Sequence, residues 1–500
     1  MADPYIVMEH ISKRFGSVLA NNDVGLSVRR GEIVALLGEN GSGKSTLVNI
    51  LAGIYLPDTG SIQIDGSPRF FHSPHDAIVA GVGMVHQHFM LIPVMNAREN
   101  ISLGEKGYVF NKKAVSAKIS RVEQEFGLTI PHDKKIYDMS VGEKQTVEIL
   151  KVLYRGASIL ILDEPTAVLT PQETMRLFAI MRNMRDAGCA IIIITHKLGE
   201  VMEISDRVAV LRGGQLTGSV NTRDTTPREL TEMMVGASVS LEINRPAPAA
   251  SVKQPMLEVR SLSLSNKEGV KVIDDISFDL YGGEILGVAG IAGSGQKELC
   301  EILTGLRHAD SGSARFEGDE LLKLSPRAIK NRGIRLSFIP EDRLGMGLVA
   351  GMSITDNVLL RHYDGTPGIF INRASGKTQA ETIVQRYAVS TPSVNHIVKK
   401  LSGGNIQKVL LGREIETNPR LLITAYPARG LDIGASYSIY DMLNERKKRG
   451  VAVLFIGEDL DVLRELCDRI IVIHNGTLMS IVDPFLTSKE DIGLLMLGHR

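Results

Sequence analysis

The sequence has few cysteines, no excess of either charge and no long apolar segment. Cys189, Cys300 and Cys467 are the only cysteines among 500 residues. Their wide spacing fits no metal-binding motif, and an odd count does not suit a disulfide framework, so we expect a reducing, cytosolic compartment. Lys plus Arg and Asp plus Glu both total 57, which leaves no overall charge to attract nucleic acid or anionic lipid.

Segments that direct a chain to or through a membrane are also scarce. The first residues, MADPYIVMEH, are acidic rather than basic and no apolar stretch follows them, so we predict no secretory signal. Apolar runs such as CAIIIIT (189–195) are much shorter than the roughly 20 residues that a membrane helix requires. We therefore expect a chain that does not itself span a bilayer.

What the sequence does contain is an internal duplication. The segment GEIVALLGENGSGKSTL, which starts at Gly31, aligns with GEILGVAGIAGSGQKEL, which starts at Gly283. SDRVAVLRGGQL, from Ser205, aligns in the same way with CDRIIVIHNGTL, from Cys467. Because 500 residues exceed what one hydrophobic core usually supports, the repeat predicts two homologous domains.

Domain limits and fold class follow from this repeat. We predict an N-terminal domain over 1–243 and a C-terminal domain over 256–500, joined by a short linker rich in Pro and Ala over 244–255. Within each half, short apolar runs alternate with longer amphipathic stretches, which is typical of strands joined by crossover helices. The predicted fold class is therefore α/β, a mostly parallel sheet flanked by helices. IVMEHISKRF and SIQIDGSPRFF look like hairpin strands and predict a small antiparallel layer.

A glycine-rich loop in the first half is the strongest functional motif. In EIVALLGENGSGKSTL the glycines let backbone N–H groups surround a phosphate, the lysine reaches the β and γ phosphates, and the next serine ligates Mg²⁺. The loop lies between an apolar strand and a helix, as such a site requires. The predicted nucleotide-binding residues of this loop are Gly38, Glu39, Asn40, Gly41, Ser42, Gly43, Lys44, Ser45 and Thr46.

The acidic pair in ILILDEP is the second motif. Asp163 ends a predicted strand, where its carboxylate suits the shell of Mg²⁺, and Glu164 can orient or deprotonate an attacking water. A lone Asp-Glu pair is usually a solvated turn. Together with the phosphate-binding loop it indicates phosphoryl transfer.

With these motifs the whole chain resembles the ABC-transporter ATPases that have two nucleotide-binding domains fused in tandem. The resemblance implies two P-loop NTPase domains, each with a helical subdomain, that bind ATP and Mg²⁺. It also implies that Gln87 in HQHFM belongs to the Q-loop near the metal, that His196 in IIIITHK contacts the γ-phosphate, and that Phe15 stacks on adenine. A Phe that ends a strand is more often a core residue, but we favour stacking on adenine for Phe15.

The second half has lost the charged residues of this set. Its glycine loop persists, but a glutamine replaces the lysine, a lysine replaces the serine, Ala-Tyr replaces Asp-Glu, and glutamates replace the Q-loop glutamine and the switch histidine. These residues are Gly290, Gly293, Gly295, Gln296, Lys297, Ala425, Tyr426, Glu341 and Glu458. Losing a general base alone commonly costs roughly 10²- to 10⁴-fold in rate, so we predict that this second site is catalytically silent.

The signature loops show the opposite asymmetry. MSVGEKQ, which contains Ser140, departs from the family's LSGGQ pattern at two positions, whereas LSGGNIQK keeps Ser402, Gly403 and Gly404. The resemblance implies that the two domains close head to tail, with each ATP between one domain's P-loop and the other's signature loop. One composite site is then fully equipped, and the opposite site is defective on both sides.

The resemblance is closest to bacterial importers of simple sugars or of nucleosides, the latter served by a basic-membrane-protein-type lipoprotein. It implies a peripheral ATPase at the cytoplasmic face of the inner membrane, bound to two integral-membrane permease subunits and indirectly to an extracytoplasmic solute-binding protein, without nucleic acid. Met84, Met90 and Met95 are either core or a surface for a permease helix, and the turn Glu341–Arg343 is the corresponding candidate in the second half.

Two other functions are considered. A soluble tandem ABC ATPase that acts on ribosomes or DNA is disfavoured by the short Pro-rich linker and by the scattered cysteines. A nucleotide sensor that does not hydrolyse ATP is disfavoured by the complete set of catalytic residues in the first half.

Overall fold

The chain forms two compact units, Met1–Leu241 (unit 1) and Glu242–Arg500 (unit 2). The computed structural model describes residues 3–16, 18–104, 111–167, 169–236, 242–246, 254–361, 363 and 372–499. Most of the predicted linker, 247–253, lies outside the described residues. Before that gap, Ile243 packs against the core of unit 2.

Unit 1 contains an antiparallel sheet and a mostly parallel one. The first has the strand order β2-β1-β4-β5, and the second β10-β9-β3-β8-β7-β6. In the second sheet all neighbours are parallel except the edge pair β10 and β9. The strands are β1 (Ile6–Phe15), β2 (Val18–Val28), β3 (Ile33–Leu37), β4 (Thr59–Ile64), β5 (Ser67–Arg69), β6 (Val82–Val85), β7 (Ile159–Asp163), β8 (Ala190–Ile194), β9 (Arg207–Arg212) and β10 (Gln215–Asn221).

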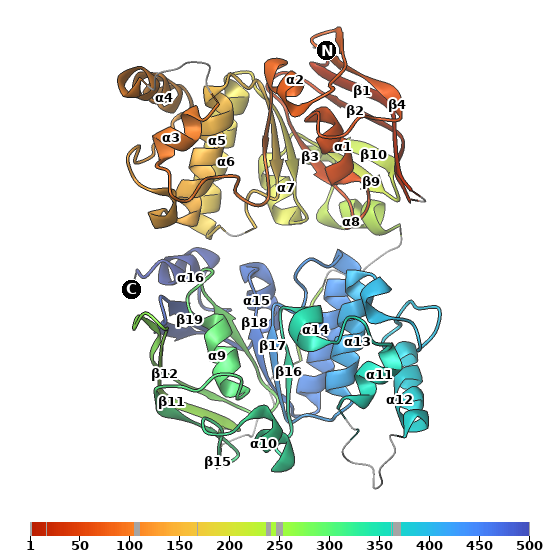
Figure 1. The fold of residues 1–500 in the computed structure, drawn as a ribbon, viewed down its shortest axis with the longest axis vertical. Helices are drawn as coiled ribbons and strands as arrows, with labels where there is room; N and C mark the ends of the chain where they lie inside the picture. Colours follow the sequence, from red (N-terminus) through yellow and green to blue (C-terminus); the bar gives the residue numbers. More distant parts are fainter. Residues whose placement is uncertain are drawn as a thin grey trace. The chain divides into compact units, whose positions relative to one another are not determined.

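Three helices of unit 1 form a group of their own. In Figure 1, α3, α4 and α5 lie together at one end of the unit, and the antiparallel strands β1, β2 and β4 lie at the other. This group is the helical part that the resemblance implied. The helices are α1 (Lys44–Leu51), α2 (Pro74–Val79), α3 (Ala97–Ser102), α4 (Lys112–Phe126), α5 (Val141–Tyr154), α6 (Pro171–Asp186), α7 (Leu198–Ile204), α8 (Pro227–Val235) and the 3-10 helices η1 (Ile136–Asp138) and η2 (Thr222–Asp224).

Unit 2 repeats this architecture in one continuous sheet, with the order β15-β14-β11-β12-β20-β19-β13-β18-β17-β16. Its antiparallel and parallel parts meet where the Asp274 amide donates to the Gly476 carbonyl at 2.8 Å, and Asn22 and Gly214 form the same bond in unit 1. The strands are β11 (Leu257–Ser265), β12 (Lys271–Leu280), β13 (Ile285–Ala289), β14 (Ser311–Phe316), β15 (Asp319–Glu320), β16 (Leu336–Ile339), β17 (Leu421–Ala425), β18 (Ala452–Ile456), β19 (Arg469–His474) and β20 (Thr477–Val482).

The helices of unit 2 follow the same plan, with α11, α12 and α13 grouped at one end of the unit (Figure 1). They are α9 (Gln296–Leu303), α10 (Pro326–Asn331), α11 (Ile354–Leu359), α12 (Arg373–Arg386), α13 (Gly403–Ile415), α14 (Ile433–Lys448), α15 (Leu460–Leu466), α16 (Lys489–Met496), the π-helix η3 (Arg343–Gly347) and the 3-10 helix η5 (Val398–Lys400). Over the described ranges, no helix has the length and apolar character needed to cross a bilayer.

The central strands explain why the sequence shows short apolar runs rather than alternation. Strands β3 and β8 in unit 1 and β13, β17 and β18 in unit 2 are buried along their whole length. Helices cover both faces of such a parallel sheet, so both sides of each strand must be apolar. The α/β prediction with a small antiparallel layer is confirmed, and the polar residues that follow these strands are left at the carboxyl edge of each sheet.

The three cysteines provide a test of this packing, since all are free and buried. Burial raises the pKa of the Cys189 thiol to about 11, and that of Cys467 well above its usual range. A raised pKa leaves less reactive thiolate at pH 8. We expect Ellman's reagent to label the native protein only slowly and to label all three thiols after unfolding in guanidinium. Rapid labelling of the native protein would contradict this packing.

Candidate functional site

The loop predicted to bind phosphate runs from the end of β3 to the start of α1. Gly38 and Gly43 have positive φ angles of 149° and 100°. A Cβ at Gly38 would clash with the carbonyl oxygen of Leu211, and one at Gly43 would clash with that of Ala20. Glycine is therefore required at both positions. At Gly41 a Cβ would meet nothing within 4 Å, so the middle of the loop faces open space where a phosphate can approach.

Lys44 is the first residue of α1, and its ammonium turns back over this loop. Its Nζ donates to the carbonyl oxygens of Gly38 at 2.7 Å and of Glu39 at 2.8 Å. Burial lowers the pKa of Lys44, and the nearby carboxylates act in the opposite direction. The cation is thus held by neutral carbonyl groups, which a phosphate oxygen can replace at a gain in charge complementarity.

The other predicted loop residues lie beside this lysine. Ser42 is buried, and its Oγ lies 3.5 Å from the Lys44 ammonium. Ser45 is exposed in the first turn of α1, where its hydroxyl is accessible to a ligand. The remaining predicted residues of the loop and first turn are Glu39, Asn40 and Thr46.

Glu164 is bound from two sides. Gln87 Nε2 donates to Glu164 Oε2 at 2.8 Å, and His196 Nδ1 lies 3.1 Å from Glu164 Oε1. The hydrogen bond from His196 lowers the pKa of Glu164, so the carboxylate is ionised at neutral pH. The three residues follow β6, β7 and β8, so they meet at the carboxyl edge of the parallel sheet, where open α/β sheets bind their ligands. Three separate predictions from the sequence thus lie in one cluster.

Asp163 occupies the end of β7 beside this cluster. Burial raises its pKa, and the charge of Glu164 adds to that effect. A carboxylate that is destabilised in this way is stabilised by a nearby cation. The Ser45 hydroxyl, the Gln87 amide oxygen and the Asp163 carboxylate are oxygen donors of the kind that Mg²⁺ prefers. These residues therefore fit Mg²⁺ held together with a phosphate.

Phe15 is not a core residue. Its side chain ends β1, is 43% exposed, and meets the Tyr55 ring edge to face with the centroids 5.2 Å apart. The interpretation of Phe15 as a core residue is therefore wrong. Stacking on adenine stays a prediction, for which the ring is accessible.

Unit 2 repeats the glycine loop with different chemistry. The glycines are Gly290, Gly293 and Gly295, which lead into α9. Gln296 is buried, and its Nε2 donates to the carbonyl oxygen of Ile291 at 3.1 Å. Lys297 is 68% exposed, and its Nζ lies 3.9 Å from Glu301. A neutral amide thus takes the place of the Lys44 ammonium.

The backbone after β17 is nevertheless the same as after β7. Tyr426 has a φ of 49° and Glu164 a φ of 46°. The Tyr426 amide donates to the carbonyl of Ile456 at 2.8 Å, as the Glu164 amide does to that of Ile194. Unit 2 therefore keeps the turn that presents a side chain to the site, but Ala425 and Tyr426 offer no carboxylate there.

In unit 2 an arginine that the sequence analysis did not identify lies beside this turn. The Arg429 guanidinium forms ion pairs with Glu341 and, at 3.5 Å, with Glu458, and it lies 5.7 Å from the centroid of the Tyr426 ring. Arg343 donates to the Arg429 carbonyl oxygen. In unit 1 an anion is bound by two neutral or basic side chains, whereas in unit 2 a cation is bound by two anions.

Two comparisons of the repeats could have found the missed residues. Arg429 in AYPARGLD aligns with Ala167 in DEPTAVLT. Glu341 and Glu458 replace Gln87 and His196 of unit 1, and two carboxylates at these positions favour a positively charged partner.

Asn21 is buried in β2 and its Nδ2 donates to the Gly43 carbonyl at 3.2 Å. It is a polar residue in an otherwise apolar alternation, and Ile273 replaces it in unit 2.

The two signature loops differ at the N-termini of their helices. Ser140 caps α5 in a capping box with Glu143, whose carboxylate accepts from the Ser140 amide at 2.7 Å and binds the Lys134 ammonium. Ser402 caps α13, and its Oγ accepts from Asn405 Nδ2 at 2.8 Å. Gly403 and Gly404 form the first turn of α13, which contains no acidic residue. A helix N-terminus favours anions, so α5 already has its own anion and α13 can accept one from outside.

Similarity to known proteins extends over the whole chain. The family described as ABC transporter matches residues 21–167 and 273–427. The nucleoside import ATP-binding protein NupA of Lactococcus lactis is 42% identical over 99% of this chain and 98% of its own length. The guanosine import ATP-binding protein NupO of Bacillus subtilis is 43% identical over 99% and 97%. The glucose import ATP-binding protein TsgD13 of Haloferax volcanii is 38% identical over 99% and 96%.

A solved structure is similar in fold over most of the chain. It is an archaeal ribosome recycling factor in complex with a ribosomal stalk protein, with a TM-score of 0.61 at 18% identity over 93% of this chain and 87% of that one. At this identity the likeness shows the fold alone.

The two loops lead to a prediction about nucleotide binding. We expect Mg²⁺-ADP to raise the Tm of the full chain, because a ligand that binds only the folded state stabilises it by about 2.7 kcal/mol at a concentration 100 times Kd. Lys44→Ala should abolish this shift. Lys297→Ala, which removes the lysine of the unit 2 loop, should retain it. Loss of the shift in Lys297→Ala alone would show that the tight site lies in unit 2.

Proposed function

Because the chain belongs to the ABC transporter family, we propose that it is the ATP-hydrolysing subunit of an importer for nucleosides or simple sugars. The observation that carries this proposal is the cluster in unit 1, where Gln87 and His196 bind the Glu164 carboxylate at the same sheet edge as the Lys44 loop. These are the parts that phosphoryl transfer requires together.

Each residue of unit 1 has a role that follows from its position. Lys44 exchanges carbonyl contacts for phosphate oxygens. Glu164, kept ionised by His196, accepts a hydrogen bond from the attacking water and orients it. Gln87 fixes the other carboxylate oxygen. Ser45, Gln87 and Asp163 would hold Mg²⁺, which would supply positive charge to the phosphoryl oxygens.

We also propose that unit 2 completes the site of unit 1. Ser402 caps a helix whose N-terminus is free of acidic residues in its first turn, which supports a role in binding the triphosphate held by Lys44. The Ser140 loop already holds the Glu143 carboxylate, and the loop of Gln296 offers no ammonium. The opposite site is therefore proposed to be defective on both sides.

The partners are proposed from the relatives and from the surface. Relatives named as import ATP-binding proteins suggest integral-membrane permease subunits, an extracytoplasmic solute-binding protein and a peripheral place at the cytoplasmic face of the membrane. Met90 is 62% exposed and suits a permease helix, whereas Met84 packs partly against the core of unit 1. In the turn Glu341–Arg343, the side chains of Glu341 and Arg343 bind Arg429, which supports a role in the Arg429 cluster, whereas the Asp342 carboxylate accepts from the Leu344 amide.

Nucleosides are the favoured solutes, because two of the relatives at 42% and 43% identity are named for nucleoside or guanosine import. The test is uptake of labelled guanosine, ribose and glucose by cells with and without the gene for this chain. Nucleoside uptake that is lost with the gene supports the proposal. Unchanged uptake of all three solutes contradicts it. The ribosome recycling factor shares only its fold with this chain, at 18% identity, so it gives no support to an action on ribosomes.

Hydrolysis should depend on the glycine-rich loop and acidic pair of unit 1 and not on the corresponding residues of unit 2. We expect Lys44→Ala or Glu164→Gln to lower steady-state phosphate release by at least roughly 10²-fold, because each removes a group that acts on the phosphate or the water. Gln296→Ala, the matched change in unit 2, should leave the rate nearly unchanged. A loss in Gln296→Ala equal to that in Lys44→Ala would contradict the asymmetry.

A further inference from the structure

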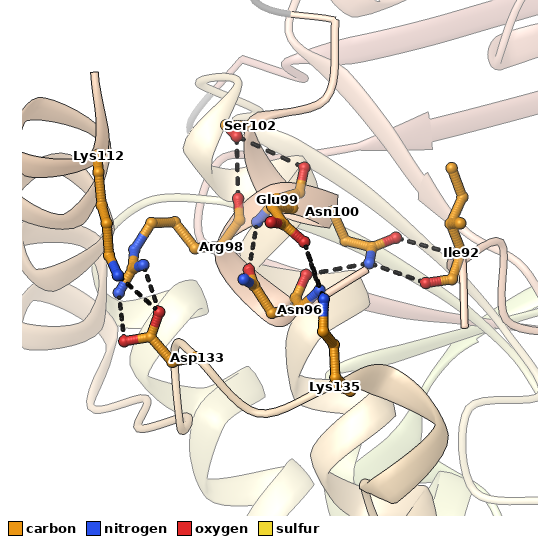
Figure 2. Close-up of polar contacts among 9 residues, drawn as sticks. All are labelled: Ile92, Asn96, Arg98, Glu99, Asn100, Ser102, Lys112, Asp133 and Lys135. Atoms are coloured by element: carbon orange, nitrogen blue, oxygen red, sulfur yellow. Dashed lines mark hydrogen bonds and ion pairs between the residues drawn. The ribbon is translucent and has the colours of Figure 1, made fainter. Parts of the chain in front are cut away.

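A buried asparagine forms the same set of hydrogen bonds in both units. In unit 1, Asn100 Oδ1 accepts from the Ile92 amide at 2.7 Å, and its Nδ2 donates to the carbonyl oxygens of Ile92 and Asn96, both at 3.1 Å (Figure 2). The amide group therefore binds both backbone groups of one residue, as a neighbouring strand would. Asn100 is almost fully buried in α3, so this contact is fixed.

Asn357 in α11 repeats every one of these contacts. Its Oδ1 accepts from the Val349 amide at 2.7 Å, and its Nδ2 donates to the carbonyl oxygens of Val349 at 3.1 Å and Ser353 at 3.0 Å. The chain between the Q-loop position and this contact is longer in unit 2 and contains a π-helix. The contact has nevertheless been kept, whereas the side chains of the catalytic positions have not. The contact therefore does not depend on the catalytic side chains, and it holds the same backbone geometry in both units.

The residue that the asparagine binds faces outward. Ile92 is 36% exposed and Val349 is 44% exposed, although their backbone groups are held from inside. We name the stretches that begin with them, 92–96 in unit 1 and 349–353 in unit 2, the outer segments. A partner that presses on the exposed side chains of an outer segment therefore acts directly on a buried hydrogen-bonded contact.

Each outer segment is also tied to the stretch that leads into its own signature loop. In unit 1 the Ile136 amide donates to the Met95 carbonyl at 3.0 Å, and Asn96 forms a β-bridge with Lys135. This stretch, 132–139, directly precedes Ser140.

Unit 2 has the same two ties. The Val398 amide donates to the Met352 carbonyl at 3.0 Å, and Ser353 forms a β-bridge with Ile397. The stretch 394–401 has the same length as the stretch 132–139 of unit 1 and directly precedes Ser402. In both units a hydrogen bond therefore connects the outer segment to a residue that lies four positions before the serine of the signature loop.

The charged contacts around this connection are not shared. In unit 1, Arg98 and Lys112 both bind Asp133, and Lys135 lies 3.7 Å from Glu99 (Figure 2). In unit 2 the corresponding helix contributes the neutral Thr355, whose hydroxyl donates to the Val394 carbonyl at 3.1 Å. The repeated parts are thus the asparagine and the backbone bonds, which are the parts that define a geometry rather than a charge.

We propose that Asn100 and Asn357 are positioning residues that hold each outer segment in fixed relation to its signature loop, so that displacement of the segment by a membrane partner moves the serine. This inference rests on the proposed function. Since Ser402 is proposed to complete the competent site and Ser140 is not, Asn357 governs the coupling of hydrolysis to the membrane partner and Asn100 does not.

The test compares the full chain alone with the complex that it forms with membrane subunits, isolated through a tag on this chain, with Mg²⁺-ATP as the probe. We expect Asn357→Ala to lower phosphate release by the complex about tenfold, within the usual range of coupling between two sites, while the rate of the chain alone changes by less than about twofold. Asn100→Ala, the matched control, should leave both rates nearly unchanged. Equal effects of the two variants, or a parallel fall of both rates together with Tm in Asn357→Ala, would overturn the inference.

A second pair of variants separates this inference from the proposed function. Ser402→Arg should abolish hydrolysis and Ser140→Arg should not. If that result holds and Asn357→Ala behaves as wild type, the inference fails and the composite site stands. If the two serine variants are equally active, the composite site fails, and the asymmetric role of Asn357 fails with it.

Hydrogen exchange of the unaltered protein gives a measurement that does not depend on a variant that folds. Formation of the complex should slow amide exchange in the outer segment 349–353 and in 398–405 together, because the two are connected by hydrogen bonds. Protection of the outer segment without any change in 398–405 would overturn the inference.

Discussion

The turn after β7 is the constraint on which the site depends. The Glu164 amide donates to the Ile194 carbonyl, and this bond holds Glu164 at a positive φ that costs a non-glycine residue of order 1–3 kcal/mol. In return, the carboxylate meets Gln87 and His196, which follow the neighbouring strands. Because β6, β7 and β8 are parallel and paired in register, their carboxyl ends bring together residues that lie far apart in the sequence.

Unit 2 separates the scaffold from the chemistry. Tyr426 keeps the positive φ and the amide bond of Glu164, although it has no carboxylate to present. The cluster around it has exchanged its charges, so that Arg429 now binds Glu341 and Glu458. In unit 2 these ion pairs connect the segments that follow β16, β17 and β18 through side chains of unit 2 alone. In unit 1 the corresponding segments meet at the Glu164 carboxylate, beside the nucleotide loop. The duplicate has thus kept the turn and replaced the contacts of Glu164 with Gln87 and His196 by the ion pairs of Arg429 with Glu341 and Glu458.

Much of this arrangement could be predicted from the sequence, and the reasons are local. The glycine loop and the acidic pair each lie directly after a buried apolar strand, and the repeat fixes the matching positions in the second half. The family and the fold class are confirmed. The roles of Gln87, His196 and Ser402 depended on the resemblance, because no local pattern shows what a glutamine, a histidine or a serine will face.

The residues that the sequence did not reveal are recognised only by their contacts in the folded chain. The sequence does not show that Arg429 forms ion pairs, because its partners Glu341 and Glu458 follow different strands and lie beside it only in the folded chain. Asn100 and Asn357 look like ordinary polar helix residues, and only their burial and backbone partners distinguish them. Phe15 could not be assigned from its place at the end of a strand, because the same pattern suits a core ring and an exposed one.

The central claim is that each chain hydrolyses ATP at one place. It is tested most directly by counting the ADP molecules that orthovanadate traps on the full chain within its membrane complex after turnover. We expect one trapped ADP per chain, and none in Glu164→Gln. Two trapped ADP molecules per chain, or one that persists in Glu164→Gln, would contradict it.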